Sequence, residues 1–404
     1  VIHLKRSEFM NTLFILSNSP GEVSGWMGPV TKALAESRLE LSITGVTLPC
    51  PYASGMEAGS ARLMPGVADV VRLREAMRAA SSEGRRLILQ LGGDPMYGWA
   101  LSMKLRAPWM IYTARPRWRG RVRHYFIPDE FAQRRFEKAG VAADRRSLVG
   151  NLILDSVPER GSCRAEEFRR RYGIAAEHII CFMPGSRPFE YELGFAFYSE
   201  CARILHKKYP GWQAVFPVAP TVDEACLRSG LEKAGLKWRG GEHVEEILPD
   251  DGCRVPLVRS CQYEAIAAAS LAVAFPGTNN LQIASLGVPL LMIAPLNQAE
   301  NIPLDGLAGA ISPSAPGLRL LKKRLVFWYN SKENYVSLPN RLAGRPVLPE
   351  RREIMTPESA CYYISELIES PERRRGIAEE YAKLNLRRGA SAKIAEKIGE
   401  FFRA

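Results

Sequence analysis

The chain has 404 residues, of which 46% are hydrophobic and 24% are charged, and its formal net charge is +12. This length is sufficient for two or three domains and excludes a single small module. The positive charge favours an anionic partner such as a nucleotide diphosphate, a phosphorylated lipid, an acidic membrane surface or a nucleic acid. No apolar stretch reaches about 18 residues, so the sequence predicts no membrane-spanning helix.

The eight cysteines and five histidines are dispersed along the chain. They form no Cys-x-x-Cys pair and no spacing typical of a zinc site. We therefore expect no metal and no cofactor. We also expect reduced thiols, as in a cytoplasmic protein.

Short apolar runs alternate with amphipathic segments along nearly the whole chain, which is typical of βαβ units and a parallel sheet. The expected strands lie at residues 13–16, 41–46, 87–91, 109–112 and 125–127, and then at 179–183, 213–217, 271–275 and 288–293. The pattern predicts an α/β protein with two doubly wound, Rossmann-like domains, over residues 10–175 and 176–370. A helical tail over residues 371–404 follows, and a ligand is expected in the cleft between the domains.

Two loops of the first domain place a carboxylate directly after a predicted strand. In residues 20–26, Glu22 and Ser24 lie where a helix begins, so that backbone N–H groups can bind an anion or a sugar oxygen. In residues 92–95, Asp94 is placed to accept a proton from a sugar hydroxyl. Simpler interpretations stay open, because Ser24 can cap the helix while Glu22 complements its dipole, and Gly-Asp-Pro is also an ordinary turn.

Two loops of the second domain suit a phosphorylated ligand. After one strand comes the permanently charged guanidinium of Arg187, which fits a diphosphate, and Glu190 lies just beyond it. After another strand, residues 276–282 offer backbone amides and small polar groups at a helix start. Arg187 can instead pair with Glu190 on the surface, and residues 276–282 can be only a capped helix. The binding residues predicted from these loops are Gly185, Ser186, Arg187, Glu190, Gly277, Thr278, Asn279 and Gln282.

At these loops the sequence resembles the lipid-A-disaccharide synthases. That family carries G-E-x-S-G-D, a strand-end aspartate motif, L-P-G-S-R with a nearby glutamate, S-G-T-x-x-L-E and Y-V-S-L-P-N-x-L-A-G-R, in this order. The corresponding segments here are residues 21–26, 93–95, 183–187, 276–282 and 335–345, and the last of them is nearly unaltered. The resemblance extends over about residues 11–400.

The resemblance implies a GT-B fold in which the first domain is the acceptor side and the second binds the nucleotide sugar, with Ser24 and Asn340 among the binding residues. It implies an inverting transfer of a glucosamine-type sugar from a UDP-linked, acylated donor to a phosphorylated glycolipid acceptor, without a metal. Asp94 is then the expected general base, and Glu22 is the alternative. The resemblance also implies a peripheral protein on the inner face of the cytoplasmic membrane, and it is compatible with a homodimer.

The sequence departs from the family pattern at positions that bear on the substrate. Trp26 and Gln282 stand where the family has an aspartate and a glutamate, and residues 113–119 are far more basic. A related GT-B transferase with a different lipid acceptor and a sugar-nucleotide epimerase therefore stay open. Arginines around Trp118 also leave open a nucleic-acid-binding protein. No RNA-binding signature is present, however, and we expect no nucleic-acid partner.

Two segments are candidates for contact with a membrane surface. In residues 320–329, three consecutive cations lie among apolar and aromatic residues, a composition suited to an anionic interface. The alternative is a helix in which Leu321, Leu325 and Trp328 form a buried stripe. Residues 63–73 are the second candidate, although they are more polar.

Overall fold

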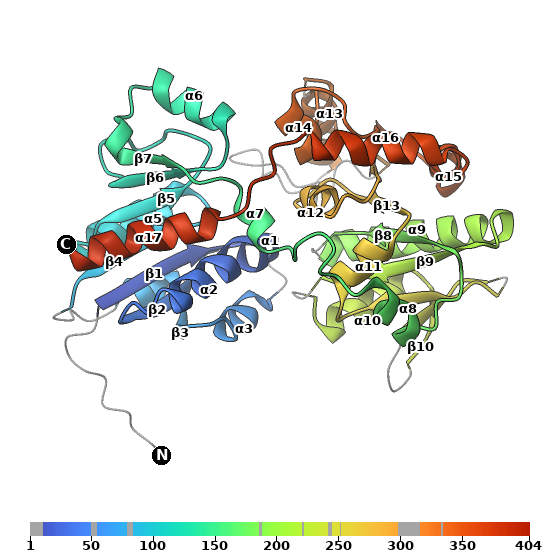
Figure 1. Ribbon diagram of the computed structural model, residues 1–404, viewed down its shortest axis with the longest axis horizontal. Helices are drawn as coiled ribbons and strands as arrows, with labels where there is room; N and C mark the ends of the chain where they lie inside the picture. Colours follow the sequence, from blue (N-terminus) through green and yellow to red (C-terminus); the bar gives the residue numbers. More distant parts are fainter. Residues whose placement is uncertain are drawn as a thin grey trace, which may run out of the picture.

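The computed structural model describes residues 11–49, 55–78, 84–185, 188–219, 222–240, 245–250, 252–297, 316–332 and 334–404. These residues form two α/β domains that lie side by side, each with helices on both faces of a central sheet (Figure 1). The predicted fold class, two Rossmann-like domains with helices at the end of the chain, is confirmed.

The first domain has a sheet in the order β3-β2-β1-β4-β5-β6-β7, in which all neighbouring strands are parallel. Leu13 and Ile15 pack on one face of this sheet, and Phe14 and Leu16 pack on the other. Helices cover both faces, which explains why central strands such as β1, β4 and β5 contain long buried apolar runs. The strands are β1 (Asn11–Ser17), β2 (Leu41–Thr47), β3 (Val67–Arg72), β4 (Arg86–Gln90), β5 (Trp109–Tyr112), β6 (His124–Ile127) and β7 (Arg146–Leu148). The helices are α1 (Pro20–Glu22), the π-helix η1 (Val23–Met27), α2 (Gly28–Glu36), α3 (Glu57–Arg62), α4 (Leu73–Ala76), α5 (Pro95–Leu105), α6 (Glu130–Lys138), the 3₁₀-helix η2 (Ala143–Arg145) and α7 (Leu152–Asp155).

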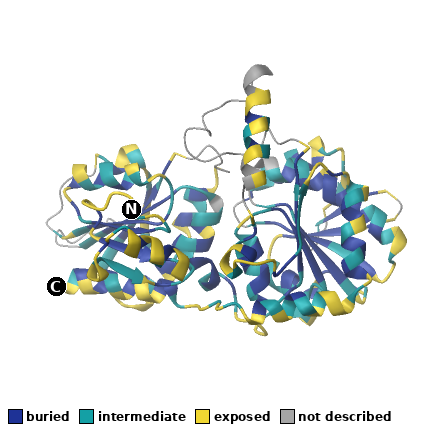
Figure 2. Cartoon of the chain, turned by 90° about the horizontal axis from the view of Figure 1, so that it is seen from above, coloured by how far each residue is buried: buried dark blue, intermediate teal, exposed yellow. Residues whose placement is uncertain are grey.

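The second domain has a sheet in the order β10-β11-β12-β9-β8-β13-β14-β15, which is parallel except around β11. Figure 2 shows the buried strands at the centre of each domain, enclosed by helices. The strands are β8 (His178–Met183), β9 (Trp212–Pro217), β10 (Lys237–Arg239), β11 (Glu245–Leu248), β12 (Val255–Val258), β13 (Leu271–Ala274), β14 (Leu290–Pro295) and β15 (Glu350–Glu353). The helices that follow the first domain are α8 (Ala165–Arg171), α9 (Pro188–Lys208), α10 (Glu224–Lys233), α11 (Gln262–Ala268), α12 (Asn279–Ser285), α13 (Pro316–Lys332), α14 (Leu338–Ala343), α15 (Pro357–Ile368), α16 (Pro371–Ala382) and α17 (Ala390–Arg403).

The helices at the end of the chain pack on different domains. α16 packs against α15 of the second domain, whereas α17 returns to the first domain and lies along α2 (Figure 1). Ile394, Ile398 and Phe401 of α17 are buried in the core that also contains Leu13 and Ile15. The apolar period of the sequence predicts these helices, but it does not indicate that the two separate.

A side chain of α7 holds the start of α17. The carboxylate of Asp155 accepts hydrogen bonds from the backbone N–H groups of Gly389 and Ser391 and from the Ser391 hydroxyl, each at 2.7 Å. The N-cap residue of α17 is Gly389, which has no side chain to cap the helix, so Asp155 satisfies amides that the helix leaves unpaired. Arg388 adds a hydrogen bond to the carbonyl of Val157. The returning helix is therefore attached at a defined point.

α13 stands out from the body of the molecule and carries exposed residues along its length (Figure 2). Leu321 and Trp328 are 47% and 55% exposed, whereas Lys322 and Val326 are buried. The alternative interpretation of this segment, a helix with Leu321 and Trp328 in a buried stripe, is therefore wrong. In the described part of the chain, no helix combines the length and the apolar character needed to cross a membrane.

We expect Asp155→Ala to lower the free energy of unfolding by about 2–3 kcal/mol, because several hydrogen bonds to a charged group are lost at once. Urea unfolding measures this loss. The matched control is Asp129→Ala, which removes the cap of α6, a hydrogen bond of 2.7 Å from the Ala132 backbone N–H. That control should cost about 1 kcal/mol. Equal losses in the two variants would contradict a special role for Asp155.

Candidate active site

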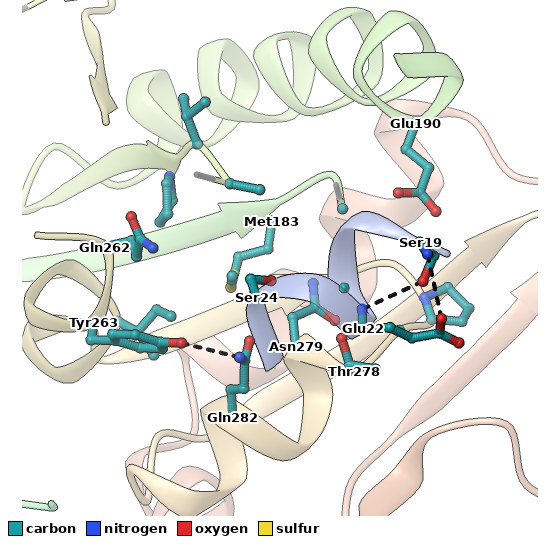
Figure 3. Close-up of a pocket in the computed structure, with 18 of the residues that line it drawn as sticks. Ser19, Glu22, Ser24, Met183, Glu190, Gln262, Tyr263, Thr278, Asn279 and Gln282 are labelled. Carbon is teal, nitrogen blue, oxygen red and sulfur yellow. Dashed lines mark hydrogen bonds between the residues drawn. The ribbon is translucent and has the colours of Figure 1, made fainter. Parts of the chain in front are cut away.

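A cavity of about 280 Å³ lies between the two domains, at the carboxyl ends of β1, β8, β9 and β13 (Figure 3). α1 and η1 of the first domain form one wall, and loops of the second domain form the other together with α9, α11 and α12. Doubly wound sheets bind their ligands at this edge. The lining residues are Ser19, Gly21, Glu22, Ser24, Trp26, Met183, Gly185, Glu190, Pro217, Val218, Ala219, Gln262, Tyr263, Ile266, Pro276, Gly277, Thr278, Asn279 and Gln282.

Glu22 is the carboxylate that the first domain places in the cavity. It lies in α1, and its Oε2 atom accepts hydrogen bonds from the backbone N–H groups of Asn18 at 3.3 Å and Ser19 at 3.4 Å. Figure 3 shows the contact with Ser19. The carboxylate also packs against Gly92, where an added Cβ would collide with it. The loop after β4 therefore holds the position of Glu22 although it does not line the cavity.

The segment after Glu22 is a π-helix, which the sequence pattern does not predict. Within η1, Ser24 and Trp26 line the cavity while the other residues are buried. The Trp26 ring meets Tyr112 edge-on, with a centroid distance of 5.4 Å and an interplanar angle of 68°. π-Helical turns are rare and recur at functional sites. Where the resembling family has an aspartate, this cavity thus has an aromatic wall.

Tyr112, which supports Trp26, is itself fixed by the backbone. Its hydroxyl donates a hydrogen bond to the Gly150 carbonyl at 3.3 Å and accepts one from the Leu152 N–H at 3.2 Å. Burial raises the pKa of Tyr112, so this group stays neutral. The aromatic wall is therefore held by the segment that leads out of the first domain.

Gly185 and Glu190 meet at the opposite wall. Gly185 follows β8 and has a φ angle of +117°, which favours glycine, and an added Cβ would collide with the Glu190 carboxylate. Glu190 lies in the first turn of α9 and points towards the cavity (Figure 3). The predicted binding residues Ser186 and Arg187 lie between them, outside the described residues.

The start of α12 supplies several polar groups of the second wall. Gly277, Thr278, Asn279 and Gln282 all line the cavity. The Gln282 side-chain amide donates hydrogen bonds to the Tyr263 hydroxyl at 3.1 Å and to the Ser156 hydroxyl at 3.3 Å. Ser156 directly follows α7 of the first domain, so Gln282 links the two sides of the cleft.

Two predicted site residues do not line the cavity. Asp94 caps α5 by accepting a hydrogen bond from the Met96 N–H at 2.8 Å, as expected for the turn alternative. Asn340 is buried, and its side-chain oxygen accepts hydrogen bonds from the N–H groups of Val347 at 2.7 Å and Leu348 at 3.0 Å. The structure gives both side chains a local structural partner.

Other lining residues were not predicted from the sequence. Pro217, Val218 and Ala219 follow β9, and Gln262 and Tyr263 lie in α11. The first group has a detectable signal, because it directly follows a predicted strand of the second domain. Gln262 and Tyr263 have no such sequence signal, because many short helices begin with a polar and an aromatic residue.

The lining of the cavity combines polar and apolar side chains. It combines two carboxylates, Glu22 and Glu190, with hydroxyl and amide groups. Among the described residues, no three or more His, Cys, Asp or Glu side chains are grouped so that they could hold a metal ion. The arrangement can accept a proton and bind hydroxyl groups at a site shared by two domains.

This geometry is that of a GT-B fold, and solved structures share it. The UDP-N-acetylglucosamine 2-epimerase of Neisseria meningitidis, in a crystal structure bound to UDP-GlcNAc, superposes with a TM-score of 0.57. It is 14% identical in sequence, and the match covers 97% of this chain and 100% of that one. A putative UDP-N-acetylglucosamine 2-epimerase of Listeria monocytogenes also has a TM-score of 0.57, at 12% identity, with 97% and 96% coverage. At these identities the likeness shows the fold.

The proteins that are similar in sequence carry a different name from the solved structures that are similar in fold. No model of a known protein family matches the chain. The lipid-A-disaccharide synthase of Myxococcus xanthus is 26% identical over 416 residues, covering 94% of this chain and 95% of that protein. Those of Syntrophus aciditrophicus and Pseudomonas aeruginosa are 28% and 30% identical, but the matches span 55% and 60% of their length and 63% and 66% of this chain. This similarity supports a glycosyltransferase.

We expect Gly92→Ala to displace the Glu22 side chain and to lower stability by about 1–3 kcal/mol, because the new methyl group overpacks a filled space. Chemical unfolding gives the stability, and a crystal structure of the variant gives the position of Glu22. The control is Gly211→Ala, where a Cβ meets no atom within 4 Å. An undisturbed Glu22 in the Gly92 variant would contradict the packing role of the β4 loop.

Proposed function

We propose that the protein is an inverting glycosyltransferase. It moves a glucosamine-type sugar from a UDP-linked, acylated donor to a phosphorylated glycolipid acceptor. The observation that carries the proposal is the cavity between the domains, whose two walls are the loops that resemble the lipid-A-disaccharide synthases. The relative of similar length, from Myxococcus xanthus, supports it. We place the protein at the inner face of the cytoplasmic membrane, where such an acceptor lies.

The second domain is proposed to bind the donor. The described wall there offers the polar groups of α12 next to the apolar side chains of Val218 and Ile266, a combination suited to a nucleoside. The fold neighbour from Neisseria meningitidis binds UDP-GlcNAc, which supports a UDP-sugar as the ligand. Arg187, outside the described residues, stays a prediction for the diphosphate.

The first domain is proposed to activate the acceptor, with Glu22 as the general base. Its carboxylate takes the proton from an acceptor hydroxyl, whose oxygen forms a bond to the anomeric carbon as the bond to UDP breaks. UDP leaves with the bonding electron pair, and the anomeric configuration inverts. Backbone N–H groups of Asn18 and Ser19 fix the carboxylate in position, which favours this reaction by orientation. Asp94 fits the role less well, because it lies outside the cavity and caps α5.

A sugar-nucleotide epimerase is the second candidate, favoured by the fold of the solved neighbours. The two activities differ in a simple assay. An epimerase converts a UDP-sugar without an acceptor and keeps the nucleotide attached, whereas a transferase releases UDP only when an acceptor is present. A transferase that uses another lipid acceptor would release UDP with that lipid instead.

We expect Glu22→Gln to lower turnover by about 100-fold or more while UDP affinity stays unchanged, because the amide cannot take the proton. Turnover is followed as UDP released from a UDP-linked acylated glucosamine in the presence of a monosaccharide lipid phosphate, and affinity by calorimetry. Asp94→Asn is the matched control and should retain turnover within a few-fold. If the Asp94 variant alone loses activity, the assignment of the base is reversed.

The acceptor class implies contact with a membrane surface, and α13 is proposed to make it. Leu320, Leu321 and Trp328 are exposed on this helix, and Arg324 is exposed beside them. Apolar side chains next to cations suit an anionic lipid interface. Leu63, which is 89% exposed, is the main apolar group of the second predicted surface.

We expect the protein to pellet with anionic vesicles at low salt and to be partly released at high salt, because salt screens surface charge. Lys323→Gln with Arg324→Gln should weaken attachment by roughly 1 kcal/mol per cation. The control pair, Arg170→Gln with Lys207→Gln, removes the same charge from another exposed surface. Equal pelleting of both double variants would exclude α13 as the attachment site.

A further inference from the structure

The arginine-rich loop at residues 113–123 is explained only in part by the fold. Trp118 stacks on Trp99 with a centroid distance of 5.2 Å and an interplanar angle of 22°, so it packs within the protein and is not a free platform for bases. The Arg117 carbonyl accepts a hydrogen bond of 2.6 Å from the Tyr125 hydroxyl. These contacts fix the loop, and its last arginines then lie at a second cavity.

This second cavity has a volume of about 630 Å³ and lies at the amino ends of β4, β5, β6 and β7. It is therefore at the opposite edge of the first sheet from the proposed active site. Arg85, Arg123 and Arg145 directly precede β4, β6 and β7. β6 and β7 are adjacent strands about 5 Å apart, and β5 alone separates β4 from β6, so the three arginines lie at the same end of the sheet. The charged side chains of the lining are Arg85, Arg121, Arg123, Arg145, Lys397, Asp144 and Glu400.

Among the side chains that line the cavity positive charge dominates, with five Lys or Arg residues and two carboxylate side chains. Lys397 pairs with Glu400 at 2.6 Å, which leaves Asp144 as the second carboxylate. Arg145 donates a hydrogen bond of 2.7 Å to the Arg119 carbonyl. Neither Arg121 nor Arg123 forms an ion pair within the part of the chain that the structure describes.

Phe401 brings two guanidinium groups close to each other. Arg85 lies 4.3 Å and Arg123 5.5 Å from the centroid of this ring. Stacking on an aromatic ring orients a guanidinium, but it does not cancel its charge. The two guanidinium groups repel each other, and an anion near both would offset that repulsion. The cavity is thus arranged for a negative ligand.

His124 does not add to this charge near neutral pH. Burial and the nearby charge of Lys397 lower the pKa of His124 to about 4, and its Nε2 atom lies 2.8 Å from the Ser147 hydroxyl. The positive field of the cavity therefore comes from its Arg and Lys side chains.

We propose that this cavity binds a phosphomonoester or diphosphate group. Guanidinium groups match phosphate oxygens through paired N–H donors, and arginine is preferred over lysine where such a match is needed. The volume is within the range of small-molecule sites. The group can belong to a soluble metabolite or to a lipid headgroup, since both present the same oxygens. The competing explanation is that the cations only complement the negative end of α17.

The test titrates the full chain with pyrophosphate in a calorimeter. We expect Arg121→Gln with Arg123→Gln to weaken pyrophosphate binding by at least about 10-fold, the lower bound for losing a charge-assisted hydrogen bond. Arg134→Gln with Arg375→Gln removes the same charge from exposed positions elsewhere and should leave binding unchanged. UDP release in the transferase assay should match the wild type in both double variants, because neither pair of residues lines the proposed active site, so that failure here is distinct from failure of the proposed activity.

A second arm identifies the source of the phosphate. Vesicles containing phosphatidic acid present a phosphomonoester, whereas phosphatidylglycerol vesicles of equal charge do not. A wild-type preference for phosphatidic acid over phosphatidylglycerol that is lost in the Arg121, Arg123 variant would support a lipid headgroup. Equal binding of the two vesicle types by the wild type, with pyrophosphate binding lost in the variant, would support a soluble ligand. If the cavity variant and the control variant bind pyrophosphate and phosphatidic acid equally well, the proposal is overturned. The cations would then only complement the negative end of α17.

Discussion

The contact between Asp155 and the start of α17 attaches the returning end of the chain to the first domain. α17 contributes to the core of the first domain although it follows the whole second domain in sequence. The adjacent residue, Ser156, accepts the hydrogen bond from Gln282 in the cavity wall. One short segment therefore anchors the returning helix and also meets the far side of the cleft. The geometry of the candidate active site and the completion of the first domain depend on the same few residues.

Much of the fold was predictable, because its strands are strongly apolar. Helices cover both faces of each sheet, so a run such as residues 87–91 has no polar alternation and stands out from its neighbours. The path of the chain end was not predictable in the same way. Ile394 and Ile398 define an apolar helix face, but nothing in that pattern says which domain will cover it. The choice depends on Asp155, more than 230 residues earlier in the sequence.

The candidate site was predictable where a loop directly follows a strand. Glu22 and Gln282 fall in one cavity for this reason, since parallel strands end at a common edge. Asp94 also directly follows a strand, yet its side chain accepts a hydrogen bond from the Met96 N–H at the start of α5. An aspartate at this position can cap a helix or act as a general base, and the local sequence does not distinguish the two roles. Asn340 was predicted to bind the ligand because it lies in a long motif that resembles the family. Its side chain instead accepts hydrogen bonds from backbone N–H groups of its own domain. The π-helix that presents Trp26 has no established local signature.

The chain passes from the first domain to the second and returns to the first with α17, and this path affects how the protein folds during translation. The first domain leaves the ribosome early, but the helix that closes its core is made only after the second sheet is complete. Until then, the surface formed by Val30, Leu34 and their neighbours has no cover, and an exposed apolar face of this kind promotes aggregation. The second domain, whose own elements are contiguous from β8 to α16, can fold first. The first domain, although translated first, can therefore reach its complete core only after the second domain has been made.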